Sequence, residues 1–456
     1  MECRKNILLW LAIAYLAGDF AGVFAIDRIP QGLFGLIIPA VTGLFIPVLG
    51  VLLILLKRHS AFIFAILFVT GVLNSAGRAC FNTTEEQSVF AESRDKQICG
   101  VIDGKFRSSK GRPRLTLLLP NGESTWLYMG ASQDEGLRVG DSLCLGVRAV
   151  KADFSTPRGM HYVCFPAKGP QKPCVRPCAR PSLRYRMARR REALTAYMDS
   201  TLAGSLSAPQ RALMQSITYG ERINLDSATR QMFADAGVMH LLALSGLHVG
   251  IVYALLRILL GILGRSRSAL VIRSLCIILV LWAYALFTGC STSLTRAVIM
   301  ASIYEGATLL RRKRNGMAAL GASAIIACLA DPYAPLEAGF QLSYGAMLGI
   351  FLLYPAFEGI RVAKPLKPLW QMCGISFSAQ VFTLPLGLIM FGRYPMFSLL
   401  AGILCTPLTW GIMLATPLYL VSGLFPPGFT SFTIQVSDFL TQFFLKIAQL
   451  LSIFAT

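Results

Sequence analysis

Polar and ionisable side chains stand inside apolar runs in the second half of the chain, and their chemistry needs an account. The first group holds Ser245, Gly246, His248 and Gly250. Ser245 and His248 are three residues apart, so they share a helix face. Gly246 and Gly250 form a small-xxx-small pair that lets two helices approach closely. Two interpretations stay open for this group: a polar site, or helix packing with His248 bonded to a neighbouring backbone.

The second group follows Thr288 and contains Ser293 and Arg296, again three residues apart on one helix face. Arg296 lies just inside an apolar run, near one end of it. Its side chain either extends to a polar interface or faces the interior of the helices. In the second case it would offer a fixed positive charge to a phosphate.

The third group begins at Asp331-Pro332, a pair that marks a helix end, and continues with Gln341, Ser343 and Tyr344. Gln341 and Tyr344 share a helix face. Tyr344 could stack on a base or belong to an aromatic belt at a membrane interface. The three groups together indicate a polar entrance for a polyanion, without selecting DNA over other polyanions. Two weaker polar candidates in apolar runs are Glu305 and Gln380.

The composition places these groups in a membrane protein. The chain has 456 residues, of which 54% are hydrophobic and 14% charged, too apolar for an ordinary soluble enzyme. Its apolar runs are about 17 to 25 residues long, the length that a helix needs to cross a hydrocarbon core. Polar groups in such spans are costly, so their clustering is informative. The predicted spans are 7–26, 33–56, 61–80, 240–264, 269–288, 294–310, 317–330, 339–357, 369–391, 396–424 and 432–454.

Basic residues set the predicted orientation. Lys57 and Arg58 separate the second and third spans, and placing them inside puts the N-terminus in the cytoplasm and the C-terminus outside. The first run lacks a cleavage site and is predicted to remain as a span. The result is a multi-pass inner-membrane protein with about 11 spans. Pro407 and Pro417 make two half-helices an alternative for the run 396–424.

A non-membrane insert interrupts the spans. Within residues 100–164, the segment "TLLLPNGESTWLYM" predicts two strands joined by a turn, and "VGDSLCLGVRAVKA" predicts a further strand. Short strands of this kind are typical of a small β-barrel or sandwich. The predicted fold class is therefore an α-helical polytopic membrane protein with an inserted extracytoplasmic small β domain.

The insert is also rich in Lys and Arg, as is the whole chain with its formal net charge of +20. One interpretation of the basic run at its end is a solvated or lipid-facing surface. The other is a collar for phosphate backbones, because DNA binding depends largely on Lys and Arg contacts. The residues of this predicted DNA-binding patch are Arg176, Arg180, Arg184, Arg186, Arg189, Arg190 and Arg191.

Cysteines gather in and beside the insert. Outside the cytoplasm they can form disulfides, but their pairing does not follow from spacing. Cys174 and Cys178 have no second pair and no nearby His to complete a zinc site, so we expect no metal and no cofactor. The six cysteines are Cys80, Cys99, Cys144, Cys164, Cys174 and Cys178.

Three amphipathic segments follow the insert, at 193–206, 209–219 and 227–236. Ser207 and Asp226 are predicted N-caps and Gly237 a helix stop. The segments are too polar to span, so we expect them at the outer interface or packed over the mouth of the bundle.

The sequence resembles the ComEC competence family, the inner-membrane DNA channel of natural transformation. Four blocks carry the resemblance in family order, and the first includes the Ser-Gly-Leu-His signature. The first three spans and the β insert resemble the family's N-terminal region, with its OB-like extracytoplasmic domain. The blocks are "YGERINLDSATRQMFADAGVMHLLALSGLHVGIV" (219–252), "FTGCSTSLTRAVIM" (287–300), "DPYAPLEAGFQLSYGAMLG" (331–349) and "FGRYPMFSLLAGILCTPL" (391–408).

The resemblance implies a division into four regions. These are a three-span region (1–80), a basic OB-like domain (81–192), interfacial helices (193–239) and a channel domain (240–456). It also implies a path for single-stranded DNA through the lipid bilayer. The residues expected to line or shape the entrance are Ser245, His248, Ser293, Arg296, Gln341, Ser343 and Tyr344.

The resemblance further implies partners. Many family members continue into a metallo-β-lactamase-like domain, but this sequence has four histidines and no His-x-His-x-Asp-His run. We therefore expect no nuclease activity here and a protein that is not an enzyme. Either a separate nuclease does the cutting, or no cutting occurs. No phosphate-binding Gly-x-x-x-x-Gly-Lys-Ser/Thr loop is present, so force is expected from a cytoplasmic helicase-like ATPase or from the membrane potential. An extracytoplasmic DNA receptor is the remaining expected partner.

Two other functions stay open. A secondary transporter of a small anion or a lipid-linked precursor would also use broken helices and polar residues at mid-membrane. A membrane-embedded enzyme would need His248 and Glu305 to converge in one site.

Overall fold

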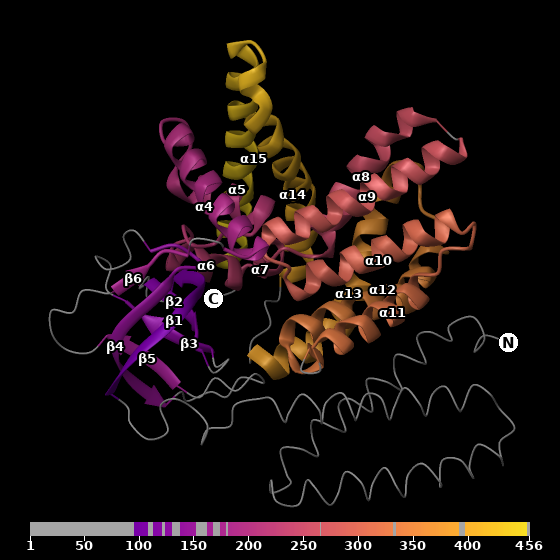
Figure 1. Cartoon of the computed structure of the whole chain (residues 1–456). Helices are drawn as coiled ribbons and strands as arrows, with labels where there is room; N and C mark the ends of the chain where they lie inside the picture. Colours follow the sequence, from indigo (N-terminus) through magenta and orange to yellow (C-terminus); the bar gives the residue numbers. More distant parts are fainter. Residues whose placement is uncertain are drawn as a thin grey trace, which may run out of the picture.

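The computed structural model describes residues 95–107, 113–120, 124–129, 137–151, 162–166, 174–178, 181–264, 266–331, 334–391 and 397–453. The three predicted N-terminal spans, Cys80 and Arg180 lie outside these residues. Figure 1 shows the described part as a small β domain beside a larger set of helices.

The β domain is a single sheet that closes on itself. Its strands are β1 (Asp95–Arg107), β2 (Pro113–Leu118), β3 (Ser124–Tyr128), β4 (Ser142–Lys151), β5 (Tyr162–Pro166) and β6 (Cys174–Arg176). The order is β1-β2-β3-β5-β4-β6, and β1 also pairs with β4. The first five strands therefore form a small barrel, and β6 extends it at β4. The predicted hairpin and the strand after Gly140-Asp141 are both confirmed.

Alternation of side chains builds the barrel core. In β2 and β3 every second residue points inward, and Leu115, Leu117 and Leu127 are at most 1% exposed. The long strand β1 pairs with two strands: its first half pairs with β4 and its second half with β2. A register shift between Ile102 and Gly104 bends the strand between them. The barrel thus closes through one continuous, bent strand.

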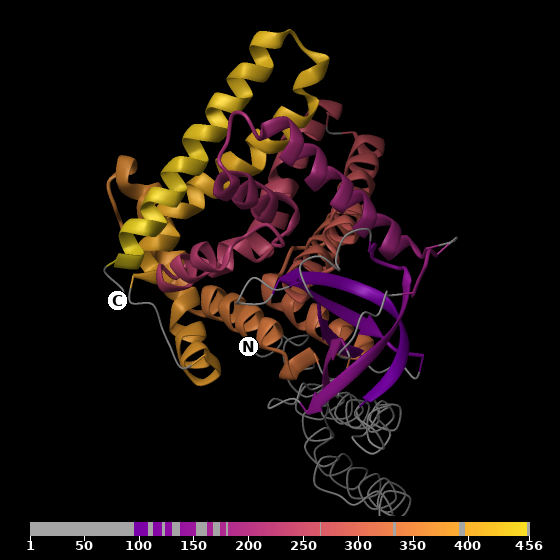
Figure 2. The ribbon, with the colours of Figure 1, turned by 90° about the vertical axis from the view of Figure 1, so that its left-hand side faces the viewer.

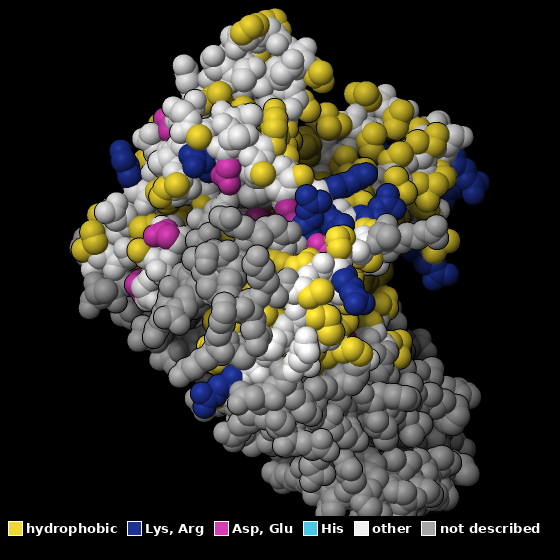
Figure 3. All heavy atoms as spheres, turned by 60° about the vertical axis from the view of Figure 1, so that its left-hand side comes forward, with side chains coloured by type: hydrophobic (Ala, Val, Ile, Leu, Met, Phe, Trp, Pro, Cys, Tyr) yellow, Lys and Arg dark blue, Asp and Glu magenta, His cyan; other side chains and the backbone are white. Residues whose placement is uncertain are grey.

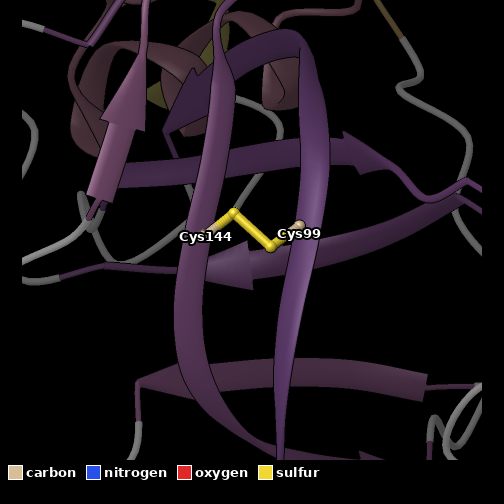
Figure 4. Close-up of a disulfide and its surroundings, with 2 residues drawn as sticks. All are labelled: Cys99 and Cys144. Atoms are coloured by element: carbon tan, nitrogen blue, oxygen red, sulfur yellow. A yellow bond between two sulfur atoms is a disulfide. The ribbon is translucent and has the colours of Figure 1, made fainter.

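A disulfide joins two strands of the barrel (Figure 4). Cys99 of β1 and Cys144 of β4 are direct cross-strand partners. The bridge closes a sequence separation of 45 residues, which restricts the unfolded chain. Sequence spacing had left this pairing open.

The predicted amphipathic segments form α4 (Leu183–Leu202), α5 (Ala208–Tyr219), α6 (Ser227–Asp235) and the short α7 (Met239–Leu242). The expected start of the first helix at residue 193 is wrong: α4 begins ten residues earlier, so it carries most of the arginine run. Ser207 caps α5 through a reciprocal bond with Gln210, and Asp226 is the N-cap of α6. Gly237 has a positive φ of 75° directly after α6, as expected for a helix stop.

The helix α5 is part of the protein core. Leu213, Met214 and Ile217 have no exposed surface and pack in one hydrophobic cluster with Phe444 of α15 and Ile412 of α14. α5 is therefore buried among the long helices and does not lie on their surface.

Eight helices follow in the order predicted from the apolar runs. They are α8 (Gly246–Leu259), α9 (Arg267–Thr288), α10 (Thr292–Leu309), α11 (Gly316–Ala330), α12 (Ala338–Glu358), α13 (Lys367–Phe391), α14 (Ser398–Val421) and α15 (Pro427–Ile453). Figure 2 shows α14 and α15 as a long hairpin beside the shorter helices α4 and α5.

Five of the described helices are long and apolar enough to cross a membrane: α8 with its 3-10 extension to Leu263, α9, α12, α14 with its extension to Leu424, and α15. Ile262 and Leu424 are 89% and 85% exposed, which suits side chains that face lipid. The half-helix alternative is wrong, because α14 runs unbroken through Pro407 and Pro417. Neighbouring helices pack against it, since Ile412 and Met413 lie in the shared cluster with α5 and α15.

Candidate functional site

The three predicted polar groups lie at the starts of α8, α10 and α12. Helices α9 and α11 connect these three helices and run in the opposite direction, so α8, α10 and α12 run in the same direction. α10 contacts both α8 and α12. Each helix start carries a partial positive charge, because its first backbone N–H groups have no partner within the helix. Their convergence favours an anion at this end of the helices.

His248 holds the start of α8. The Ser245 backbone N–H donates to His248 Nδ1 at 3.2 Å, and the Leu247 N–H donates to Ser245 Oγ at 3.3 Å. The His248 side chain is fully buried, and its Nε2 has no hydrogen-bond partner among the residues that the structure describes. His248 therefore orders the helix start and keeps one ring nitrogen unused.

Arg296 joins α10 to α8 and α12. Its guanidinium donates to the Ser343 carbonyl oxygen and lies over the Tyr344 ring, 5.4 Å from its centroid. The side chain is 5% exposed. No described carboxylate forms an ion pair with it, and its Nε has no partner. The result is a buried cation without a counter-charge among the described residues, which is an energetically costly arrangement.

The two glycines of the first group differ. A Cβ added at Gly246 would lie 3.1 Å from Arg296 Nη2, so the missing side chain is what lets the guanidinium reach α8. A Cβ at Gly250 would meet nothing within 4 Å, and Gly250 is exposed. The close approach of α8 and α10 thus depends on Gly246, and the expected packing role of Gly250 is absent from the described residues.

Polar side chains of α12 complete this cluster, with one exception. Ser343 Oγ lies 2.8 Å from Ser293 Oγ, which links α12 to α10. The Tyr344 hydroxyl lies 3.2 Å from Ser323 Oγ, and its ring stacks on Phe340. Gln341 instead donates to the Pro335 carbonyl at 2.9 Å. Gln341 therefore closes the loop before α12 rather than facing Arg296.

A second buried polar cluster surrounds Glu305, near the other end of α10. Its carboxylate is 1% exposed and accepts from Tyr253 and Ser274, each at 2.6 Å. Arg257 and Arg314 lie 3.5 and 3.8 Å from the same oxygen. The sequence alone gives little sign of this cluster, because the four donors come from three other segments of the chain. Among these bonds none reaches His248, so the convergence that a membrane-embedded enzyme would need is not formed by them.

Comparison with known proteins shows that residues 217–456 match the family model for Competence protein. That match takes in more than half of the chain. The chain belongs to the competence family. The resemblance found in the sequence is thereby confirmed, and all of the predicted path residues lie within the matched region.

Individual relatives of this competence-family chain match over about half of it. ComE operon protein 3 of Bacillus subtilis (strain 168) is 29% identical over 226 residues, 50% of this chain and 28% of the relative. Recombination protein 2 of Haemophilus influenzae is 25% identical over 256 residues, 54% of this chain and 32% of the relative. Competence protein ComA of Neisseria gonorrhoeae is 29% identical over 222 residues, 47% of this chain and 30% of the relative. Each match therefore spans less than a third of the relative, and no solved structure matches the chain.

The arginine run of this competence-family protein lies outside the family match, and three of its members have partners within the protein. Arg189 Nη2 lies 2.7 Å from Asp141 Oδ1, and its Nε donates to the Val139 carbonyl at 2.9 Å. Arg184 pairs with Asp103 at 3.1 Å. Arg191 pairs with Glu221 at 3.1 Å. These contacts fasten the β domain to α4, and α4 to the loop after α5.

The Asp103 contact also involves Tyr185, whose hydroxyl donates to Asp103 Oδ1 at 3.3 Å. Burial and the neighbouring Asp103 charge both raise the pKa of Tyr185, so the phenol stays protonated and remains a donor. By contrast, Arg176, Arg186 and Arg190 are exposed. Figure 3 shows Lys and Arg side chains gathered on one face of the molecule. Among the described arginines of the run, these three form no ion pair with a described carboxylate, whereas Arg184, Arg189 and Arg191 do. The collar stays a prediction.

Proposed function

We propose that this protein conducts single-stranded DNA inward across the inner membrane during natural transformation, as a channel and not as an enzyme. The observation that carries the proposal is the buried Arg296, held where the starts of α8, α10 and α12 meet. A guanidinium without a carboxylate partner and three positive helix ends attract the same ligand, an anion such as a phosphate. Competence-family membership supports DNA as the polyanion.

Unused hydrogen-bonding capacity supports a path along this cluster. Arg296 Nε and His248 Nε2 are buried and have no partner, and buried polar atoms of this kind are normally satisfied. A strand that passes Ser245, Ser293 and Ser343 would supply acceptors for them. Because such contacts are few and read no base edges, the strand could slide without a sequence preference.

The proposed orientation puts the β domain outside the cell membrane and the N-terminus in the cytoplasm. The Cys99–Cys144 disulfide supports this placement, because disulfides persist in oxidising compartments and are rare in the cytosol. We take the five-stranded barrel as an OB-like domain, the kind of barrel that binds oligonucleotides. Arg176, Arg186 and Arg190 would collect DNA near it.

The proposed machinery includes further proteins. A cytoplasmic helicase-like ATPase or the membrane potential would supply force. An extracytoplasmic receptor would deliver DNA, and a separate nuclease would remove the second strand.

The test is deletion of the gene, scored for labelled DNA in the cytoplasm and, separately, for DNA held at the cell surface. We expect entry to be lost while surface capture persists. Arg296→Ala and His248→Ala should each lower transformation at normal protein levels. Unchanged DNA entry in the deletion strain would refute the proposed function, whereas uptake of a small solute that fails in this strain would favour the transporter.

A further inference from the structure

A row of aromatic and arginine side chains crosses the outer face of the barrel. The strand register places Phe106 of β1 opposite Arg114 of β2, and Arg114 opposite Tyr128 of β3. Tyr128 stacks on Phe165 of β5, with ring centroids 5.5 Å apart and planes 14° from parallel. Phe165 in turn lies opposite Arg148 of β4. Five strands thus contribute one side chain each to a continuous row.

Arg114 is sandwiched within this row. Its guanidinium carbon lies 4.0 Å from the Trp126 ring centroid and 5.4 Å from that of Phe106. The Phe106 ring folds back over Gly104, where an added Cβ would lie 2.9 Å from it. Arg114 and the two rings that it contacts therefore form a preordered platform on the curved barrel wall instead of separate mobile side chains.

The platform is open and positively charged. Phe106 and Phe165 are 49% and 39% exposed, and large aromatic side chains of this kind usually turn inward in a barrel of this size. Arg148 is exposed. Among the carboxylates whose side chains the structure describes, none forms an ion pair with Arg114 or Arg148, while Asp103 and Asp141 bind arginines of α4. The cross-strand partner of Arg148 on β1 is Asp95.

We propose that this row is the surface on which the protein captures single-stranded DNA. Bases stack on Phe106, Tyr128 and Phe165, and phosphates contact Arg114 and Arg148. Stacking rings flanked by cations are the chemistry that holds single strands without reading their sequence. Neighbouring strands lie about 4.8 Å apart, so adjacent side chains of the row are close enough to contact successive nucleotides as the DNA follows the curved barrel wall. The inference rests on the proposed function, and it moves initial capture from Arg176, Arg186 and Arg190 to the outer face of the barrel.

The experiment uses the full-length protein in lipid nanodiscs and a fluorescent oligothymidine. Phe106→Ala and Tyr128→Ala should each weaken binding roughly 5- to 150-fold, the range for loss of one stacked base. Phe106→Tyr should bind like the wild type. Tyr197→Ala is the matched control, because Tyr197 is a 53% exposed aromatic on α4, away from the row.

A second variant covers the case in which an aromatic substitution disturbs the barrel. Arg148→Glu changes an exposed side chain, and it should weaken binding and lower the slope of log affinity against log salt by about one. In addition, DNA should quench the fluorescence of the wild type more than that of Trp126→Phe.

The outcomes separate this inference from the proposed function. Wild-type-like DNA binding by Phe106→Ala, Tyr128→Ala and Arg148→Glu would overturn the inference, even if DNA import still depends on the gene. The same result combined with lost transformation would assign the row to a protein partner. Loss of DNA import on gene deletion remains the separate test of the channel.

Discussion

Replacing Arg296 by Met should separate function from stability. The change removes a hydrogen bond to the Ser343 carbonyl and the contact with the Tyr344 ring at 5.4 Å. Together these are worth about 2–4 kcal/mol. The Ser343 carbonyl lies inside α12, so it keeps its helical partner after the substitution. The protein therefore loses contacts without gaining an unpaired backbone group.

The same substitution removes a cation that is 5% exposed and has no described carboxylate partner. Burying an ion without a counter-charge costs several kcal/mol. The stabilisation lost with these contacts and the burial cost removed with the charge are of similar size. We therefore expect the free energy of unfolding of Arg296→Met to stay within about 2 kcal/mol of the wild type. Met fills much of the same volume and should not leave a large cavity.

Transformation should nevertheless fall. If Arg296 contacts phosphates during passage, losing one charged hydrogen bond worth about 1.5–3 kcal/mol lowers entry about 10- to 150-fold. The transformation frequency of Arg296→Lys should lie between those of the wild type and Arg296→Met, because lysine keeps the positive charge but lacks the planar guanidinium group.

The assay is transformation frequency normalised to protein level, together with thermal unfolding in detergent. Arg312→Met is the control, since Arg312 is an exposed cation after α10. A strongly destabilised Arg296→Met protein would show that the arginine is structural. A stable one with normal transformation would remove Arg296 from the path.

Three further predictions concern the contacts that hold the protein together. Glu305→Leu removes a shared acceptor of two 2.6 Å bonds and should lower unfolding stability by about 2–3 kcal/mol in detergent melts; a melting temperature equal to that of Arg296→Met would contradict this. Arg189→Ala breaks the pair with the buried Asp141 and should speed hydrogen exchange in the barrel, by the equivalent of about 2–3 kcal/mol, whereas Arg190→Ala should not; equal exchange in both variants would argue against α4 as the fastening helix. Changing both Cys99 and Cys144 to Ser should cost about 2–4 kcal/mol, and the wild type in reducing agent should melt like this variant; insensitivity to reductant would mean that the bridge does not form.

Much of the local structure was predictable because its causes are local. Apolar runs of helical length located α8 to α15 to within a few residues, except that the first predicted span began six residues before α8. Alternating residues and a turn located the β2–β3 hairpin. Side-chain caps such as Ser207 act over three residues, so they could be recognised directly. The start of α4 was missed because its arginine-rich first half has no apolar stripe to mark a helix.

The sequence by itself determined the class of protein, the order of its elements and the three polar groups at the starts of α8, α10 and α12. Only the tertiary structure decided which arginines pair with carboxylates of the protein and which can contact a ligand. Arg184, Arg189 and Arg191 lie in one basic run, yet each pairs with a carboxylate between 30 and 81 residues away. Conversely, Phe106, Arg114 and Tyr128 are unremarkable in sequence and become a platform once three strands align. The physical reason is that periodicity and capping act within a few residues, whereas ion pairs and stacked rings depend on which distant segments the closed barrel and the packed helices bring together.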